Sequence, residues 1–423
     1  MNSVINVEGK DNIYLYGAGF FTKQIIPYLS RRDIDVKGVI VSKTDGNPND
    51  IDGIPVWEIS QLGLRIPKSE EIDLLICINN GKAIVGDMIE KYNWNSFEYV
   101  DFEIVNTLLN DFEIIFERKK TGFKLIMNYP NIEPGFAVIC HEEDYTPFAR
   151  VGIFQGIAEV EKGLSYCKKE DFKALFGDVH YINGNNIPGF SEENGKIYVV
   201  TSHLDSLDVG EFKQRGYSPI QVGAVLTDID KGCIKDSQGD NISDRNRNYC
   251  ECTAHYWIWK NIKIDGYVGV NHYRRQQWFT DKSFEDIREN EIDVILSTPQ
   301  FTPVAVKDFF LNYNVKEDWD MLANAIANVE PDYVDAFNDV ANGHFFFPCN
   351  IMTARKDFFD EYCSFAFNVA QEIEDLYLEI GVTKANRYIG FLIEVMESVF
   401  LRKHCGEFKV AFTDVSYIQP SSK

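Results

Sequence analysis

The chain has 423 residues, 45% of them hydrophobic and 25% charged, which is enough to bury more than one core, so we expect two domains and a connecting segment. Its formal net charge of −23 argues against binding to nucleic acid or to an anionic membrane surface, because like charges repel at long range. Any anionic ligand must therefore be held by a local cluster of cationic side chains.

The sequence also bears on the cellular compartment. No apolar run approaches the roughly 18 residues of a membrane span, and the opening MNSVINVEGKDN lacks the cationic and apolar regions of a signal peptide. The nine cysteines are scattered and form no CxxC pair, which predicts reduced, mostly buried thiols and argues against a zinc site. We therefore expect a cytoplasmic protein.

Residues 1–110 predict a Rossmann-like domain, because strand-like and helix-like segments alternate over most of this range. The first strand, NIYLYG, runs into Gly17-Ala18-Gly19, where such a fold places a phosphate against a helix N-terminus. Thr22 stands where the third glycine of the GxGxxG fingerprint belongs. Two interpretations stay open: Gly17 and Gly19 bind a nucleotide, or the turn needs small residues for its backbone.

The part of this domain that starts at Tyr14 resembles the nucleotide-binding-like domains attached to the N-terminus of sugar-modifying bacterial enzymes. The resemblance covers about 60 residues and includes the segment Gly53-Ile54-Pro55-Val56 after the second strand. The resemblance implies the Rossmann-like fold of this domain more securely than it implies a bound nucleotide. Residues 111–195 contain strand-like pieces and end in a run rich in Gly, Asn, Pro and Ser, so we expect a connecting segment and assign it no role.

Residues 196–423 predict a second α/β domain. The strand KIYVVTSHLD ends in polar residues, and the segment DRNRNYCECTAHYWIWKNI predicts one continuous helix. Tyr249, Thr253, Tyr256, Trp257 and Lys260 would form one face of that helix. The strand GYVGVNHYRR, the strand EIDVILSTP and a helix-rich segment from about 355 to 403 follow.

The strand GYVGVNHYRR ends in His272, Arg274 and Arg275. Two guanidinium groups suit a pyrophosphate, because each offers paired, planar donors to phosphate oxygens and keeps its charge when water is excluded. The alternative is that both arginines pair with surface carboxylates, of which the chain has many: its Asp and Glu residues number 65.

Several blocks of this second half occur in the order found in a bacterial family known as domain of unknown function 4422. The blocks IYVVTSHLD, DSQGDNISDRNRNYCECTAHYWIWKN, YVGVNHYRR, NIMTARKDFFDEYC and NRYIGFLIEVMESVFL carry the resemblance, which spans about residues 196–403. Members of the family occur among capsular and exopolysaccharide genes and are regarded as glycosyltransferases. The resemblance implies a GT-A-like glycosyltransferase domain.

In GT-A enzymes a divalent cation on a DxD motif holds the donor diphosphate. The HYRR block stands where that motif would be, so by analogy we expect Arg274 and Arg275, with His272, to replace the metal. No cofactor would then be required, and Mn²⁺ or Mg²⁺ is the alternative. The strings Asp228-Ile229-Asp230 and Asp318-Trp319-Asp320 lie in other contexts, where chance is one explanation for each, and a metal held by Asp228 and Asp230 is the alternative.

Two sets of candidate site residues follow. A transferase needs a carboxylate or imidazole base near the acceptor hydroxyl. Glu394 lies opposite the apolar stripe of its helix and faces either solvent or a cleft. His344 belongs either to an acceptor-binding loop or to an ordinary loop. Asp240 is either a catalytic residue or a residue that forms an Asx turn before the helix. The stripe comprises Ile389, Leu392, Ile393, Met396, Val399 and Phe400. The catalytic candidates are His203, Asp240, His344 and Glu394, and the donor-binding candidates are Thr201, Asn241, Asn246, Tyr256, Lys260, His272, Arg274 and Arg275.

The function expected from this sequence is transfer of a sugar from a nucleotide-sugar donor to a growing capsule or surface polysaccharide. The acceptor would be lipid-linked, at the inner face of the cytoplasmic membrane, and the protein would associate peripherally with the membrane assembly machinery. Two alternatives remain: a nucleotide-sugar reductase or epimerase that uses the N-terminal domain, and a non-catalytic scaffold in polysaccharide assembly.

Overall fold

A computed structural model gives the structure and divides the chain into two compact units. The first comprises residues 1–127, 134–137 and 152–159, and the second comprises residues 128–133, 138–151 and 160–423. The residues that the structure describes are 7, 10–30, 33–44, 46–61, 72–78, 92, 96–100, 123–126, 132, 136–141, 147–152, 180–182, 189–302, 304–384 and 387–418.

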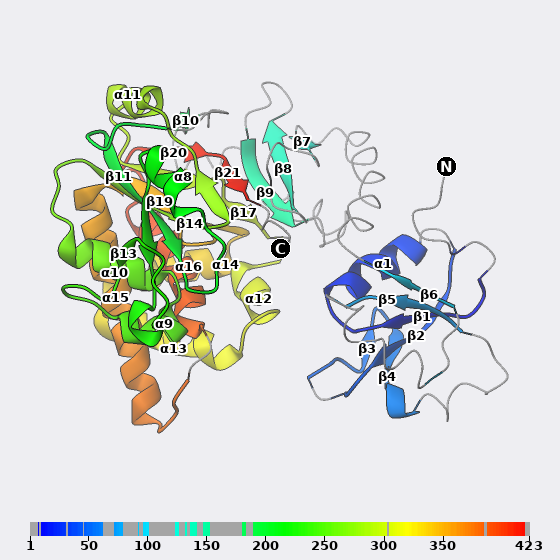
Figure 1. Cartoon of the computed structure of the whole chain (residues 1–423). Helices are drawn as coiled ribbons and strands as arrows, with labels where there is room; N and C mark the ends of the chain where they lie inside the picture. The colour runs from blue at the N-terminus through cyan, green and yellow to red at the C-terminus, as the bar shows by residue number, and fades with distance from the viewer. Residues whose placement is uncertain are drawn as a thin grey trace. The chain divides into compact units, whose positions relative to one another are not determined.

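The described part of the first unit is built on one sheet with strand order β3-β4-β2-β1-β5-β6 (Figure 1). Strands β3 and β4 pair antiparallel, and the remaining neighbours pair parallel, as the alternation of strands and helices predicts. Tyr14, Tyr16, Ile40, Leu74 and Ile76 form its core with Ile59. The elements are β1 (Ile13–Tyr16), α1 (Phe20–Ser30), β2 (Val36–Val41), β3 (Asp50–Ile51), β4 (Ile54–Glu58), β5 (Asp73–Ile76) and β6 (Ser96–Tyr99).

The second unit is a mixed α/β structure around a larger sheet with strand order β10-β20-β16-β19-β14-β11-β12-β13, to which β15 and β21 add at β14. Strands β11 to β14 run parallel, whereas β19 is antiparallel to both β14 and β16. These strands are β10 (His180–Ile182), β11 (Gly195–Thr201), β12 (Ser218–Gln221), β13 (Ile234–Lys235), β14 (Tyr267–His272), β15 (Arg275–Gln277), β16 (Val294–Ser297), β19 (Met352–Arg355), β20 (Val410–Thr413) and β21 (Val415–Tyr417).

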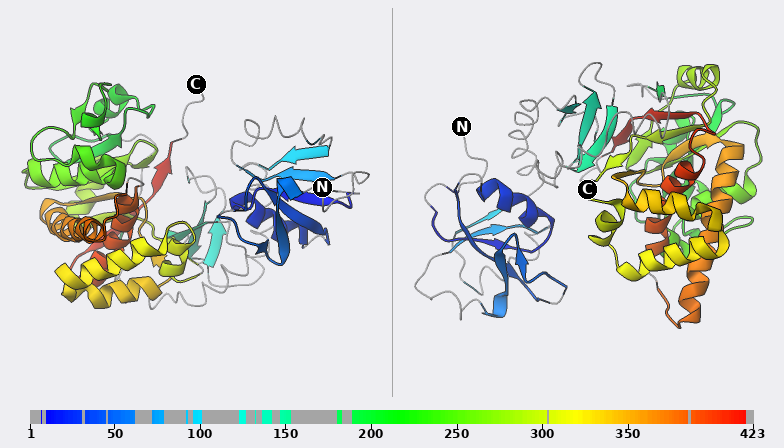
Figure 2. Two further views of the ribbon diagram at one scale, coloured as in Figure 1. Left: turned by 90° about the horizontal axis from the view of Figure 1, so that it is seen from below. Right: turned by 180° about the vertical axis from the view of Figure 1, so that it is seen from behind.

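Alternate residues of these strands enter two different cores. Ile197 and Val199 point into one, and Tyr198 and Val200 into the other, as the two-residue period of a strand requires. The larger core includes residues of α10, α13, α14, α15 and α16, and Figure 2 shows the long helix α15 in orange beside α13 in yellow and α16 in red. The helices are α8 (Val209–Gln214), α9 (Asn246–Tyr249), α10 (Cys252–Asn261), α11 (Asp281–Glu289), α12 (Val306–Leu311), α13 (Lys316–Val329), α14 (Val334–Asn342), α15 (Lys356–Glu379) and α16 (Tyr388–Lys403).

Further short strands are β7 (Phe123–Ile126), β8 (Phe136–His141), β9 (Pro147–Gly152), β17 (Gln300–Phe301) and β18 (Phe345–Phe346). Strand β17 pairs parallel with β9 and antiparallel with β18, and in this way Gln300 lies opposite Arg150. Among the described residues, no helix is long and apolar enough to cross a membrane.

Two predicted elements of the second unit differ from the structure. The continuous helix predicted over residues 244–262 is broken, because Cys250 has φ 52°, and it forms α9 and α10 instead. Tyr249 therefore leaves the predicted helix face and is buried. The strand predicted to run through Arg275 ends at His272, and a tight turn leads into the antiparallel β15.

The strand order fixes where a ligand would bind. From β11 the chain moves outward to β12 and β13, then returns to the opposite side of β11 as β14. The point between β11 and β14 is therefore a topological switch point, and open α/β sheets bind their ligands outside the carboxyl ends of strands at such points.

Candidate active site

At this switch point the turn after β14 is bonded to the end of β11, and the turn after β11 is closed by a bond of its own. The backbone N–H of Tyr273 donates to the carbonyl of Val200 at 3.0 Å, and the backbone N–H of Ser202 donates to Oδ2 of Asp205 at 2.6 Å. The guanidinium of Arg274 lies 4.9 Å from the centre of the Tyr273 ring, and its buried Nε has no hydrogen-bond acceptor among the described residues. The turn thus holds one arginine beside an aromatic ring at the carboxyl edge of the sheet.

Glu394, on α16, has the properties of a proton acceptor. Burial raises its pKa to about 7, and the negative charge of Glu251 adds to the rise. A hydrogen bond from the backbone N–H of Cys349 and the positive charges of Arg275 and Arg150 oppose it. A base is most effective when its pKa lies near the working pH. This pKa supports the interpretation that Glu394 faces a cleft and not bulk solvent. The apolar stripe predicted for α16 is buried.

Glu251, between α9 and α10, is a second carboxylate of this site. Its Oε1 accepts a hydrogen bond from the Asn350 side-chain amide at 2.9 Å and lies 4.0 Å from Nε2 of His272. Burial opposes its ionisation, but the charge that His272 carries when it is protonated, the hydrogen bond from the Asn350 amide and the charge of Arg387 hold its pKa below the usual value. Burial lowers the pKa of His272 to about 4, so this imidazole is neutral at pH 7 and its contact with Glu251 is not a full ion pair.

Three arginines act on these carboxylates. Arg275 begins β15, Arg150 lies in β9 and is 8% exposed, and Arg387 precedes α16. The positive charges of Arg150 and Arg275 reach Glu394, and the Nη2 of Arg150 is 3.5 Å from the Sγ of Cys349. The site therefore combines a carboxylate that can take a proton with cationic groups that can hold an anion.

Unusual backbone conformations gather around the same residues. Seven described residues other than glycine have positive φ, a conformation that is costly for L-residues and that clusters at functional sites. Four of the seven lie here: Cys250 (φ 52°), Cys349 (φ 78°), Asn350 (φ 49°) and Arg387 (φ 64°).

Some sequence-predicted candidates lie elsewhere on α10. Tyr256 donates from its hydroxyl to Oδ1 of Asp240 at 3.2 Å, and the Nζ of Lys260 lies 3.3 Å from the centre of the Trp259 ring. Because α10 leads from the carboxyl edge of the sheet back to its amino edge, the end that carries Lys260 is about 15 Å from Glu251. The donor-binding role of Tyr256 and Lys260 stays a prediction.

The remaining candidates have mostly local contacts. Thr201 is fully buried, and His203 follows it in the turn after β11. Asn241 donates to the carbonyl of Gly239 at 2.8 Å. Asn246 donates to the carbonyl of Cys250 at 2.6 Å, at the break before α10. His344 contacts the carbonyl of Thr302 through Nδ1 at 3.0 Å, beside the β17–β18 pair.

A buried carboxylate that the sequence did not point to, Asp236, supports the carboxyl edge of the sheet. It accepts hydrogen bonds from the backbone N–H groups of Gly223 and Ala224 at 2.9 and 3.1 Å. The hydroxyls of Ser243 and Thr253 donate to it at 2.5 and 2.7 Å. The four donors lie in the turn after β12, in the 3-10 turn that precedes α9 and in the first turn of α10, so the role of Asp236 is to fix these three segments together.

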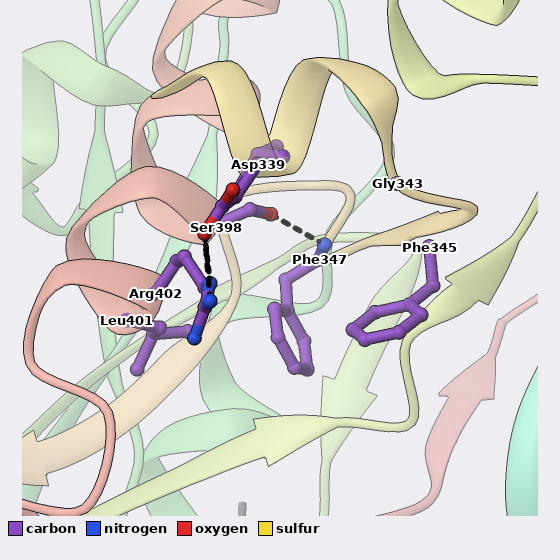
Figure 3. A pocket seen from close by; sticks show the side chains of 8 residues that line it. Asp339, Gly343, Phe345, Phe347, Ser398, Leu401 and Arg402 are labelled. Atoms are coloured by element: carbon purple, nitrogen blue, oxygen red, sulfur yellow. Dashed lines mark hydrogen bonds and ion pairs between the residues drawn. The ribbon is translucent and has the colours of Figure 1, made fainter. Parts of the chain in front are cut away.

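A small pocket of about 90 Å³ lies on α16 one turn beyond Glu394 (Figure 3). Ser398 borders it and accepts a hydrogen bond from the backbone N–H of Phe347 at 2.9 Å, which ties α16 to the chain that leads into Cys349. The Nη2 of Arg402 lies 2.6 Å from Oδ2 of Asp339 at its edge. The lining residues are Asp339, Val340, Gly343, Phe345, Phe347, Ser398, Leu401 and Arg402.

In the first unit, Gly17 has a structural reason to be glycine. Its φ is +104°, and a Cβ there would lie 2.3 Å from Cγ2 of Ile78 and 2.9 Å from the carbonyl oxygen of Cys77. Thr22, which replaces the third fingerprint glycine, donates from its hydroxyl to the Gly17 carbonyl. A Cβ at Gly19 would meet nothing within 4 Å. These contacts favour the backbone interpretation for Gly17, and the nucleotide prediction remains untested.

Metal ligands and cysteines complete the description. The described residues hold no group of three or more His, Cys, Asp or Glu side chains arranged to bind a metal ion. Asp230 instead pairs with Lys235 at 2.9 Å, and Asp318 is buried against Lys384 and the Tyr377 hydroxyl. The eight described cysteines are all free thiols.

Four residues of the site are not among the sequence-predicted catalytic and donor-binding candidates: Arg150, Glu251, Asn350 and Arg387. Glu251 lies inside what reads as a regular helix, and Arg150 lies in the segment to which no role was assigned. The polar exit of the aromatic run NGHFFFPCN, at Asn350, is the one signal that could have identified a member of the set.

Comparisons with known proteins follow this geometry. The model of the family described as Domain of unknown function (DUF4422) matches residues 196–405. A solved structure, the apo form of the bifunctional glycosyltransferase WbbM, is similar with 22% sequence identity and a TM-score of 0.45. The similarity covers 54% of this chain and 45% of the WbbM chain, so less than half of that protein's length is represented. The curated proteins give no match. Residues 196–405, which contain most of the candidate site, are therefore the part of the chain that is similar to the DUF4422 family.

Proposed function

We propose that the second unit is a GT-A-like glycosyltransferase that moves a sugar from a nucleotide-sugar donor to a hydroxyl of a growing surface polysaccharide. One observation carries the proposal. A partly buried carboxylate with a pKa near 7, Glu394, lies under the positive charges of Arg150 and Arg275 and beside Glu251, whose Oε1 is 4.0 Å from Nε2 of His272 at the carboxyl end of β14. Glycosyl transfer needs both a proton acceptor and a cationic site for the leaving diphosphate. The resemblance of the sequence blocks to a family regarded as glycosyltransferases supports the same reaction.

In the proposed reaction Glu394 takes the proton of the acceptor hydroxyl while the acceptor oxygen forms a bond to C1 of the donor sugar. The bond between C1 and the diphosphate oxygen breaks, and the electron pair leaves with the nucleoside diphosphate. Arg275 and Arg150, with Arg274 in the adjacent turn, offset the charge that develops on that oxygen. A single displacement of this kind inverts the configuration at C1.

The proposal gives the diphosphate to arginines and not to a metal on a DxD motif. The two DxD strings support this assignment, because one aspartate of each is already engaged: Asp230 with Lys235, and Asp318 with Lys384 and the Tyr377 hydroxyl. Transfer should then continue in EDTA and gain little from added Mn²⁺. Complete loss of transfer with the chelator and recovery with metal would overturn the arginine assignment.

The first experiment is a search for the donor. The full chain is scanned for thermal stabilisation by a panel of nucleotide-sugars and by the matching nucleoside diphosphates, since a ligand that binds the folded state raises the unfolding midpoint. Donors that stabilise are then incubated with lipid-linked oligosaccharide acceptors, and the products are analysed by mass spectrometry. We expect at least one donor to stabilise and to transfer. If no nucleotide-sugar stabilises the protein and none is consumed, the proposal fails.

The acceptor and the setting belong to the same proposal. We infer a lipid-linked acceptor at the inner face of the cytoplasmic membrane, and peripheral association with the polysaccharide assembly machinery, from the resemblance to capsule-associated proteins. Transfer to a free oligosaccharide as fast as to its lipid-linked form would argue against this acceptor.

A further inference from the structure

We propose that Asn350 is a positioning residue for the reaction proposed above: its side-chain amide joins Glu251 to the first turn of α16 and fixes this carboxylate as the neighbour of Glu394. The inference rests on the proposed function for its catalytic meaning. It assigns a role to a residue that touches neither reacting group in that mechanism.

The contacts of Asn350 support this role. Its Nδ2 donates to Oε1 of Glu251 at 2.9 Å and to the carbonyl of Gly390 at 3.3 Å, so one NH₂ group connects the start of α10 to the start of α16. The residue is fully buried. Its Oδ1 has no hydrogen-bond partner among the described residues. Buried polar groups are normally hydrogen-bonded, and here only the NH₂ group of the amide is. We therefore assign the role of Asn350 to the two bonds that its NH₂ group donates.

The backbone at this position restricts which residues could do the same. Asn350 has φ 49° and follows Cys349 with φ 78°, and a left-handed conformation is costly for most L-residues and tolerated best by Gly, Asn and Asp. Gly would accept the backbone but has no amide. Asp would accept it but would place a second carboxylate against Glu251. Asn alone of these three combines the conformation with a donor.

The consequence for Glu394 is electrostatic. The charged groups that act on it are Glu251, Arg150, Arg275 and Arg387. The neutral titratable groups close to it are Glu397, Tyr362, Cys250 and Cys252, whose pKa values are all raised by burial first. Glu251 is therefore the one negative charge among these neighbours at pH 7, and a donor that keeps it ionised in place also keeps the proton affinity of Glu394 high.

Three single variants separate this role from a merely structural one through the pH dependence of transfer. Asn350→Gly removes the donor that holds the Glu251 carboxylate beside Glu394, and Glu251→Gln removes the negative charge itself. In both variants the activity should rise at a pH about one unit lower than in the wild type. In Asn350→Asp a second negative charge is added, so the rise should move to higher pH. Simple loss of packing would not move Asn350→Gly and Asn350→Asp in opposite directions.

A rescue variant tests the hydrogen bond itself. In the double variant Glu251→Gln with Asn350→Asp, the amide and the carboxylate exchange places. The bond between positions 251 and 350 and the single negative charge are kept, and the bond to the Gly390 carbonyl is lost. Its pH profile should return toward that of the wild type. If Asn350→Gly and Asn350→Asp shift in the same direction, if neither shifts, or if the exchange restores nothing, the role assigned to Asn350 is overturned.

A readout without activity separates failure of this inference from failure of the proposed function. The difference in unfolding free energy between each protein and its Glu394→Gln derivative, followed against pH, reports the titration of Glu394 even when no sugar is transferred. Opposite shifts in this difference for Asn350→Gly and Asn350→Asp, without transfer by any of the proteins, would refute the glycosyltransferase and retain the positioning role. Transfer without such shifts would retain the glycosyltransferase and refute the positioning role of Asn350.

Discussion

Arg387 donates from Nε to the Sγ of Cys250 at 3.0 Å, and both residues have positive φ. The contact joins the break between α9 and α10 to the residue that precedes α16, and the backbone N–H of Arg387 reinforces it by donating to the carbonyl of Arg247 at 3.0 Å. Gly390 allows the close approach, because a Cβ there would lie 3.3 Å from the Tyr249 carbonyl oxygen. The break in the chain that carries Glu251 is thus fastened to the start of α16, the helix that carries Glu394.

Glu394→Gln should lower kcat by a factor of about 100 to 10,000, the usual contribution of a positioned general base, because Gln cannot take the acceptor proton. Wild-type kcat/KM should fall as the pH drops through about 7, where Glu394 becomes protonated. Initial rates from pH 5.5 to 9 measure both effects. A variant that keeps wild-type kcat, or a profile that is flat across pH 7, would remove Glu394 from the catalytic role.

The same variant should be more stable than the wild type at high pH. Burial raises the pKa of Glu394 from 4.5 to about 7, so the folded state binds a proton more tightly than the unfolded state. The contribution of Glu394 to the unfolding free energy of the wild type, measured against Glu394→Gln, should therefore be fully present below pH 4.5 and be lost as the pH rises through 7. The loss should approach about 3 kcal/mol. Urea unfolding at pH 5 and pH 8 tests the sign, and an equal difference at the two values would contradict it.

Arg275→Ala should weaken binding of the donor and of its nucleoside diphosphate by a factor of 10 or more, on the order of a lost charge-assisted hydrogen bond. Arg402→Ala is the matched control. Arg402 lies near the C-terminal end of α16 and is paired with Asp339 of α14, so its loss should leave the affinity unchanged. Calorimetric titration measures both. Equal affinities for Arg275→Ala and the wild type would exclude Arg275 from the diphosphate site.

Asp236→Asn should destabilise the second unit by about 3 kcal/mol, because an amide replaces one acceptor oxygen with a donor that faces other donors. Four hydrogen bonds end on this buried carboxylate. Asp230→Asn, which changes an exposed carboxylate paired with Lys235, should cost less than about 1 kcal/mol. Chemical unfolding of both variants gives the comparison, and similar losses would show that Asp236 has no special structural role.

Gly17→Ala should destabilise the first unit by at least about 2 kcal/mol, since the added Cβ meets Ile78 and the Cys77 carbonyl and the backbone has positive φ. Gly19→Ala, where a Cβ would meet nothing within 4 Å, should change stability by less than about 0.5 kcal/mol. Scanning calorimetry of the full chain distinguishes the two. Equal effects would leave Gly17 without its steric explanation.

The fold follows closely from the sequence where the pattern is local. The alternation of strands and helices predicted the parallel sheet of the first unit, and the apolar stripe of Ile389 to Phe400 predicted the buried face of α16, because both patterns repeat at the period of their element. The break at Cys250 was not predicted. A single residue with φ 52° leaves no trace in hydrophobic periodicity, since its conformation is set by Arg387 and Asn246.

The sequence by itself determined the chemistry that one strand end could offer, with Arg274 and Arg275 after His272, and it named Glu394 as a carboxylate outside the apolar stripe. Tertiary structure alone decided which groups surround Glu394. Arg150, Glu251, Arg275 and Asn350 come from separate segments, and each reaches the site through contacts between residues far apart in the chain. Burial and the charge of Glu251 together move the pKa of Glu394 to about 7, and neither can be read from its neighbours in sequence.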